Sequence, residues 1–427
     1  MRSHKAIINY VFAAFIAQGS YFILIPIIIN FLGEEALADI ELFNVYANLL
    51  FQFFGLNICS AVTKYKYESK DNIDYLEFSS NIYAFGILIS LFSCLFSFLI
   101  IFFQPSYWRL STSLTALLPL AVFFLFSNFW IQNYFVTLKK VVKYRNYQIL
   151  IGFCKIFSIL LIVFLLDSLD PFSKILSEFL ILANLSIFFI YSEKIQIKVY
   201  RFKSDIKRAL KFSSPLVLYV VVNNLLNYSD QLFISNYFEK IDLAVYSLGY
   251  RVGMIILIFY VSIANYYSIN FYENFENKKK NKNNTIKIIA LLFVASIILI
   301  FFSSYYIEYS SQWIGYKLNL AIKINKLVIF SYFINSIFLL YSRELFYEGK
   351  TFKISFLVII CAFLNIFLNF FFLKSSGIIM AAYTTLISYS LLALLSIILM
   401  LKSNRKINSQ IILFYILFVF LFYLVIS

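Results

Sequence analysis

The sequence has few of the residues that soluble proteins place at their surfaces and in their turns. Of the 427 residues only 13% are charged, and the chain has 10 glycines, 5 prolines and a single histidine. Soluble domains average about 25% charged and about 45–50% apolar residues. Here 62% of the residues are hydrophobic and the mean hydropathy is +0.84. This composition excludes an ordinary soluble enzyme and predicts an integral membrane protein.

Cysteine and histidine are also too scarce to indicate metal or redox chemistry. The four cysteines, Cys59, Cys94, Cys154 and Cys361, fall in or at the ends of apolar runs and have no metal-ligand spacing. We therefore expect them to be packing residues and not disulfides. His4 lies at the terminus. The sequence thus predicts no metal site, no cofactor and no catalytic residue.

Long apolar runs make up most of the remaining chain. A helix needs about 20 apolar residues to cross the hydrocarbon of a bilayer. Twelve runs meet that length, no soluble domain fits between them, and a shorter apolar tail at 411–426 is a candidate for a thirteenth. The twelve predicted spans are at about 6–30, 42–63, 80–103, 113–137, 147–166, 172–192, 212–238, 243–268, 286–307, 321–345, 353–373 and 377–401.

Lys and Arg are distributed unevenly between the two sets of loops. The N-terminus and the loops on its side carry 27 of the 36 Lys and Arg residues, whereas the first loop on the opposite side, GEEALADIE, is acidic. By the positive-inside rule, the N-terminus is predicted to be cytoplasmic. The net charge of +15 therefore follows membrane topology and does not indicate nucleic-acid binding.

The longest cytoplasmic connection, 193–211, divides the chain into an N-lobe (1–192) and a C-lobe (212–401), each with six spans, followed by an apolar tail (402–427). The two lobes show a weak internal sequence repeat, because IIINFLGEEALADIELFNVY resembles LFISNYFEKIDLAVYSLGYR. Each copy reads as a helix end, a short acidic turn and a new helix. Transporters are often built from such repeats, with a substrate site between them near the middle of the membrane.

Ionisable residues inside predicted spans are the strongest functional candidates. Asp230, Lys155 and Arg251 are of this kind, and such charges usually face a water-filled cavity or one another. Asn223, Asn227 and Asp230 follow i, i+4, i+7 spacing and so share one helix face. Asp230 and Arg251 are predicted at nearly the same depth on consecutive antiparallel helices, so we hypothesise that they pair in one state. Snorkelling or a purely structural ion pair is the alternative role for the two cations.

Three weaker candidates lie elsewhere in the spans. Glu178, in the outer third of the sixth span, joins Asp230 as a candidate for ion coupling. Pro26 is expected to kink the first span and is a candidate gate. Asn365 and Asn369 are spaced i, i+4, for which interhelical hydrogen bonding is the usual role in membranes and sugar contact the alternative.

Several stretches resemble one family of exporters. FSSPLVLYVVVNNLLNYSDQLFISNYFEKIDLAVYSLGYRVG looks like the start of the second lobe in polysaccharide and O-antigen exporters. These belong to the multidrug/oligosaccharidyl-lipid/polysaccharide flippase superfamily. A later stretch resembles the pattern N-x-x-x-N … GI-x-x-A-A-x-x-T of these exporters, here Asn365, Asn369, Gly377, Ala381, Ala382 and Thr385. The resemblance implies an all-α, MATE-like bundle in which two six-helix lobes surround a central cavity.

The same resemblance implies a function. Such proteins carry undecaprenyl-pyrophosphate-linked sugar units from the inner to the outer leaflet of the bacterial inner membrane. Membrane lipids, a coupling ion (H⁺ or Na⁺) and the polymerase and chain-length regulator of the same pathway are the expected partners. For this anionic cargo we expect Arg251, Lys155, Asp230, Asn223 and Asn227 to line the cavity. A drug or cation antiporter of the same superfamily is the main alternative. An O-antigen polymerase or ligase is less favoured, because no large periplasmic loop is visible.

Overall fold

The computed structural model describes residues 2–69, 72–165, 170–193, 199–257, 259–260, 278–314, 319–347 and 351–402. Across these ranges the chain forms α-helices joined by short turns, and no strand occurs in them. The chain divides into two compact units, Met1–Leu225 and Leu226–Ser427. The all-helical fold predicted from the apolar runs is confirmed.

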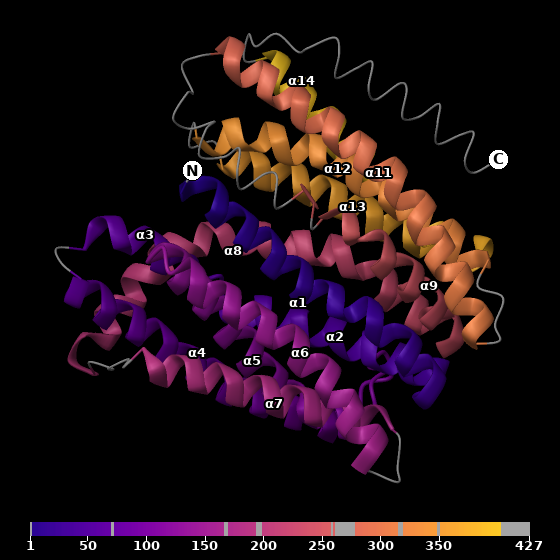
Figure 1. The fold of residues 1–427 in the computed structure, drawn as a ribbon, viewed down its shortest axis with the longest axis horizontal. Helices are drawn as coiled ribbons and strands as arrows, with labels where there is room; N and C mark the ends of the chain where they lie inside the picture. The colour runs from indigo at the N-terminus through magenta and orange to yellow at the C-terminus, as the bar shows by residue number, and fades with distance from the viewer. Residues whose placement is uncertain are drawn as a thin grey trace. The chain divides into compact units, whose positions relative to one another are not determined.

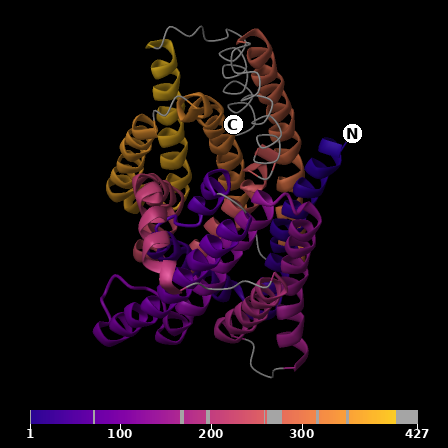
Figure 2. The ribbon, with the colours of Figure 1, turned by 90° about the vertical axis from the view of Figure 1, so that its left-hand side faces the viewer.

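One helix, α5, forms the centre of the first unit. It packs against α2, α3, α4, α6 and α7, and 56% of its span is buried, against 28% for α4. Figures 1 and 2 show these helices running alongside one another. The unit comprises α1 (Arg2–Leu32), α2 (Glu34–Gly55), α3 (Ser60–Glu68), α4 (Asn72–Phe103), α5 (Thr112–Thr137), α6 (Val141–Leu165), α7 (Pro171–Ser192) and the larger part of α8 (Val199–Tyr237).

The second unit is organised around α12 in the same way. That helix packs against α9, α11, α13 and α14, and 78% of its span is buried. Figures 1 and 2 show α11 to α14 side by side in orange to yellow. The unit contains the end of α8, α9 (Lys240–Gly253), α11 (Lys278–Ile314), α12 (Asn319–Tyr347), α13 (Thr351–Ser376) and α14 (Ile379–Lys402).

The outer faces of these helices are apolar, as a bilayer requires. Phe98 and Phe102 on α4 and Phe301 and Phe302 on α11 are each more than 60% exposed. Within the described residues, nine helices are long and apolar enough to cross a membrane, or up to eleven when each bent pair counts as one span. The chain is therefore a multi-pass membrane protein. Two predicted segments are not fully described. Most of the part of span 243–268 that follows α9, and all of the tail 411–426, fall outside the described residues.

The predicted second span, 42–63, is broken into two helices. α2 ends at Gly55, Leu56 and Asn57 adopt left-handed conformations with φ of 48° and 49°, and α3 begins at Ser60 with a bend of 44°. The Ser60 hydroxyl donates to the Asn57 carbonyl at 2.7 Å, which satisfies one acceptor freed by the break. Broken helices in membranes are tolerated where the freed backbone groups find such partners.

The predicted start of this span is also wrong. The acidic stretch GEEALADIE is typical of an outer loop, but α2 begins at Glu34. Acidic residues are favoured in the first turn of a helix, where they face the positive end of the helix dipole. Glu41 consequently lies two turns inside α2 and is fully buried.

The predicted connecting loop, 193–211, is helical from Val199 onward. α8 is a 39-residue helix, and it bends by 56° between Ser214 and Leu216. The intervening Pro215 lacks the amide hydrogen that would continue the helical ladder, which explains a bend at this point. The many Lys and Arg residues of 199–211 suggest a loop, but they are good helix formers. The compact units meet at Leu225–Leu226 within α8, whereas the lobe boundaries drawn from the sequence stay a prediction.

An ion cluster joins the end of α7 to the turn between α5 and α6. Glu193 forms ion pairs with Lys140 and with Lys143, the latter at 2.5 Å. Tyr134 also donates a hydrogen bond to this carboxylate at 3.4 Å. Burial alone would raise the pKa of Glu193, but the two ammonium groups outweigh it and hold the pKa below its usual range. Glu193 and Lys140 lie outside the apolar spans, and the cluster fixes the ends of three helices.

Candidate functional site

The candidate site is built around the carboxylate of Asp230 in α8, which has no exposed surface. One carboxylate oxygen accepts hydrogen bonds from the Tyr246 hydroxyl of α9 at 2.7 Å and from the Thr385 hydroxyl of α14 at 2.5 Å. The other accepts from the Asn369 side-chain amide of α13 at 2.6 Å. Four helices of the second unit therefore meet at one buried carboxylate, and all three donors are neutral.

A second layer of side chains holds those donors in place. Thr384 donates to the Asn369 amide oxygen at 2.8 Å, which points the Asn369 amide hydrogens toward Asp230. Asn369 also donates to the Asn365 oxygen at 3.2 Å, and Ser229 donates to the same oxygen at 2.7 Å. Asn365 and Asn369 are fully buried. The interhelical hydrogen bonding expected of this i, i+4 pair is confirmed.

A tight turn fixes the register of the two helices that supply this layer. α13 ends at Ser376 and α14 begins at Ile379. Between them Gly377 has φ of 80°, and its N–H donates to the Leu373 carbonyl at 3.0 Å. Glycine adopts this left-handed conformation without the steric penalty that a Cβ brings, and such residues commonly end helices. The turn places Thr384 and Thr385 opposite Asn365 and Asn369.

A cluster of tyrosines surrounds Asn227, one turn before Asp230 on α8. The side-chain oxygen of Asn227 accepts hydrogen bonds from Tyr389 at 2.5 Å and from Tyr332 at 3.4 Å. Tyr250 donates to the Asn227 backbone carbonyl at 3.1 Å, and its hydroxyl lies 2.6 Å from that of Tyr332. This cluster adjoins the Asp230 network through the stacked rings of Tyr246 and Tyr250, whose centres are 5.7 Å apart. Asn223 is half-buried one turn earlier on α8, and its contact with cargo stays a prediction.

The predicted pairing of Asp230 with Arg251 is not what this structure contains. Arg251 is half-buried near the end of α9, while the Asp230 carboxylate is occupied by Tyr246, Asn369 and Thr385. An ion pair between Asp230 and Arg251 is not among those of the described residues. The pairing therefore stays a hypothesis for a different state of the protein.

Glu178, a candidate of the first unit, is paired within its own helix. Its partner is Lys174 on the same helix, α7, with which it forms a buried ion pair. Lys174 lies in the first turn of α7 and is only 2% exposed. Lys155 is half-buried within α6. α1 continues as one helix through Pro26, and a gating role for this proline stays a prediction.

Sequence reasoning missed a second buried carboxylate. Glu41 of α2 accepts a hydrogen bond from Tyr21 of α1. In the second unit Tyr246 of α9 donates to Asp230 of α8 in the corresponding helix pair. The donor thus lies on the earlier helix in the first unit and on the later helix in the second. Glu41 escapes notice because its stretch has the composition of a loop, whereas its position seven residues after Glu34 could have indicated a helix.

The Asp230 network can hold a proton or a small hard cation. Carboxylate, amide and hydroxyl oxygens are the ligands that hard cations prefer. The Tyr246 and Thr385 hydroxyls can rotate to present an oxygen in place of a hydrogen. Among the described residues, no group of three His, Cys, Asp or Glu side chains could hold a metal ion, and all four cysteines are free. The chemistry at this site is therefore that of oxygen ligands around a single buried carboxyl group.

The chain was compared with known protein families and with solved structures, and its fold is similar to that of known transporters. The MatE family model matches residues 215–371, which include Asp230, Tyr246, Asn365 and Asn369. The fold is similar to that of a MOP-superfamily transporter from Pyrococcus furiosus, with a TM-score of 0.64, 15% identity and coverage of 92% of this chain and 94% of the other. It is also similar to a multidrug-resistance MATE transporter in an inward-facing conformation, with a TM-score of 0.65, 15% identity and coverage of 90% and 92%. The chain has the MATE fold.

The MATE fold is shared by proteins that move different cargo. The lipid II flippase MurJ, in an inward closed conformation, is similar at a TM-score of 0.66 with 18% identity and coverage of 97% of this chain and 98% of the other. No curated protein matches the chain by sequence. The MATE-like architecture implied by the sequence resemblance is confirmed as a fold, and the cargo has to be argued from the residues.

Proposed function

We propose that this chain is a lipid-linked oligosaccharide flippase. Its cargo would be an undecaprenyl-pyrophosphate-linked repeat unit of O-antigen or a related surface polysaccharide, moved from the inner to the outer leaflet of a bacterial inner membrane. The MATE fold, the MatE match over 215–371 and the likeness to the lipid II flippase MurJ support a transporter of this kind. A pyrophosphate needs fixed positive charge within the membrane, and Lys155 and Arg251 are cations inside apolar helices.

The observation that carries the proposal is the Asp230 carboxylate held by three neutral donors. A buried carboxylate is costly unless its charge is compensated. A proton or a monovalent cation that enters the network would provide that compensation, with the Asn365 and Asn369 side-chain oxygens close by. Uptake and release at Asp230 would then couple an ion gradient to the movement of the cargo.

Deletion of the gene tests the cargo. We expect surface polysaccharide to be lost and lipid-linked repeat units to accumulate on the cytoplasmic side. Normal surface polysaccharide in a strain without a redundant flippase would refute the proposal. Altered drug resistance with intact polysaccharide would instead support the alternative, a drug antiporter; multidrug resistance is named for the MATE transporter of the same fold.

Substitution of Arg251 tests the cationic contact with cargo. Arg251→Ala should abolish export, whereas Arg251→Lys keeps the charge without the planar fork and should retain part of it. Membrane abundance of each variant, measured by immunoblot, controls for folding. Full export by Arg251→Ala at normal abundance would remove this residue from the mechanism.

Ion binding at Asp230 can be measured without cargo. Thermal unfolding of the purified protein in sodium chloride should occur at a higher temperature than in choline chloride, and Asp230→Asn should remove the difference. A ligand at about 100 times its Kd stabilises by about 2.7 kcal/mol. Glu193→Gln, which removes a carboxylate outside the spans, should keep the sodium effect. If sodium has no effect on the wild type, the same comparison across pH tests a proton instead.

A further inference from the structure

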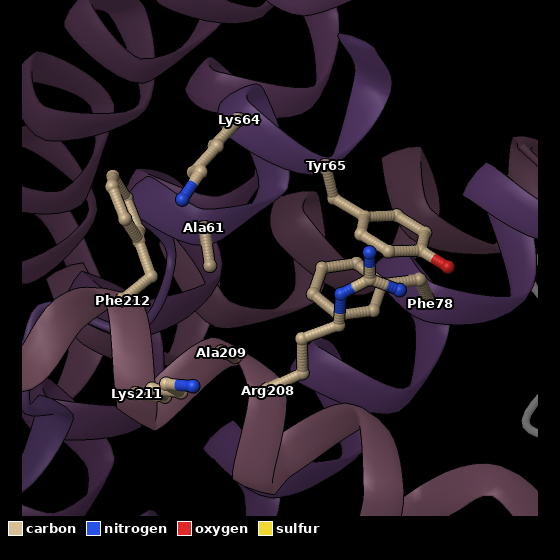
Figure 3. A pocket seen from close by; sticks show the side chains of 8 residues that line it. All are labelled: Ala61, Lys64, Tyr65, Phe78, Arg208, Ala209, Lys211 and Phe212. Carbon is tan, nitrogen blue, oxygen red and sulfur yellow. The ribbon is translucent and has the colours of Figure 1, made fainter. Parts of the chain in front are cut away.

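A cavity of about 470 Å³ lies within the first unit, outside the Asp230 network. It is formed by the second half of the broken helix pair, α3, by the start of α4 and by the N-terminal part of α8 (Figure 3). Its eight lining residues include three cations and no carboxylate. They are Ala61, Lys64, Tyr65, Phe78, Arg208, Ala209, Lys211 and Phe212.

The walls of this cavity are fixed by an ion cluster between α4 and α8. Arg201 pairs with Asp74 at 2.6 Å and with Glu77 at 3.2 Å. Asn81 of α4 donates to Asp205 of α8 at 2.7 Å, and both residues are buried. The nearby carboxylates are thus bound to partners beside the cavity. The start of α8 is held against α4, so Arg208 and Lys211 are presented to the cavity by an anchored helix.

Aromatic rings hold two of the cations in place. The Lys64 ammonium lies 4.4 Å from the centre of the Phe212 ring, and the Arg208 guanidinium lies 4.5 Å from that of Tyr65 (Figure 3). Tyr65 in turn stacks on Phe78, with ring centres 3.9 Å apart. Such cation–π contacts hold each charged group over the face of its ring.

The cavity combines a charged mouth with an apolar floor. Lys64, Arg208 and Lys211 are exposed, whereas Tyr65 and Phe78 are at most 4% exposed. The floor is completed by the buried methyl groups of Ala61 and Ala209. Such a site favours a ligand that carries negative charge on one end and apolar surface on the other.

The position of the cavity along the helices matches the level of lipid headgroups. The broken span that contains α3 ends at Lys66, the span of α4 begins at Asn72, and that of α8 begins at Arg201. These helix ends belong to the side with most of the Lys and Arg residues, which is predicted to be cytoplasmic. Basic pockets between membrane helices on that side commonly bind anionic lipid headgroups.

We propose that this cavity is a binding site for the phosphate headgroup of an anionic membrane lipid. The phosphate would lie among Lys64, Arg208 and Lys211, and the glycerol and first acyl carbons would lie on the aromatic floor. A volume of about 470 Å³ is far larger than a phosphate ion needs and falls within the usual range for small-ligand sites. The proposal does not depend on the cargo that the protein moves.

The test uses the purified full-length protein in detergent with added phosphatidylglycerol, phosphatidylcholine or inorganic phosphate. Phosphatidylglycerol should raise the thermal unfolding temperature, and the other two additives should not. Because each cation near an anionic lipid contributes about fivefold to affinity, Arg208→Gln with Lys211→Gln should weaken phosphatidylglycerol binding about thirtyfold. Lys64→Gln, a change at an exposed residue of the mouth, should weaken it several-fold.

The matched control is Lys203→Gln with Lys207→Gln. These two exposed cations lie on the same helix and do not line the cavity. The control should bind phosphatidylglycerol as the wild type does, and unfolding temperatures without lipid show whether each variant is folded. Equal weakening in the control would assign the effect to general surface charge and overturn the proposal. Stabilisation by inorganic phosphate equal to that by phosphatidylglycerol would overturn the assignment to a lipid.

Discussion

The hydrogen bond from Tyr246 to Asp230 provides a direct measure of the charge at the candidate site. Tyr246→Phe removes a single hydroxyl from a fully buried ring and leaves the carboxylate two of its three donors. Hydrogen bonds to charged groups contribute about 1.5–3 kcal/mol, against about 0.5–1.5 kcal/mol for neutral pairs. Because neither residue is exposed, water cannot replace the lost donor. We therefore expect Tyr246→Phe to lower the free energy of unfolding by about 1.5–3 kcal/mol.

Tyr147→Phe is the matched control for this measurement. Tyr147 is also fully buried, and its hydroxyl lies 3.0 Å from that of Ser186, which is a neutral partner. Tyr147→Phe should therefore lower the free energy of unfolding by about 0.5–1.5 kcal/mol. Both values can be measured by reversible unfolding with sodium dodecyl sulfate in mixed micelles. In an Asp230→Asn background the cost of Tyr246→Phe should fall to the neutral range. Equal losses for Tyr246→Phe and Tyr147→Phe in the wild type would refute this prediction, because they would indicate that Tyr246 bonds to a neutral carboxyl group.

Three further predictions concern packing, pH and topology. Gly249→Ala should destabilise the protein by about 1–3 kcal/mol, because an added Cβ would lie 2.5 Å from the Ala321 backbone oxygen. The control is Gly19→Ala, where the nearest atom to the added Cβ would be 3.8 Å away, and it should change the unfolding temperature little. The lowered pKa of Glu193 means that its ion cluster stabilises the fold fully above the ordinary value of 4.5 and is lost as pH falls through the folded pKa. The difference in unfolding temperature between wild type and Glu193→Gln should therefore shrink in acid, and a difference that grows there would contradict this sign. In spheroplasts, an impermeant thiol reagent should label Ser375→Cys and not Lys279→Cys, and the reverse pattern would overturn the orientation.

Hydrophobic run length predicts the helices well, because a bilayer imposes a minimum length on every span. It fails at the helix ends, where polar residues are compatible with a loop and with a helix that extends beyond the hydrocarbon. The acidic stretch after Gly33 and the basic segment before Pro215 both have the composition of loops, and both are helical. The break at Leu56 and Asn57 cannot be seen in the sequence because no proline marks it.

The centre of the candidate site could be predicted from the sequence, but its partners could not. A carboxylate inside an apolar run identifies Asp230, and i, i+4 spacing identifies Asn365 and Asn369 as a pair. Nothing local connects them, since 139 residues separate Asp230 from Asn369. Arg251 is the partner that attraction between opposite charges predicts, but in the structure Tyr246 and Thr385 donate to the carboxylate.

The hairpin formed by α13 and α14 contacts α8 as a single unit. Gly377 sets its register, and the bond from Thr384 to Asn369 holds it together without any contribution from α8. If α8 slides past this hairpin, the two hydrogen bonds that Asn369 and Thr385 donate to Asp230 must break. Those bonds are strong only while the carboxylate is charged, because neutral hydrogen bonds are worth about half as much. If Asp230 takes up a proton, as proposed, these two bonds would weaken, and protonation would set how readily the second unit changes shape.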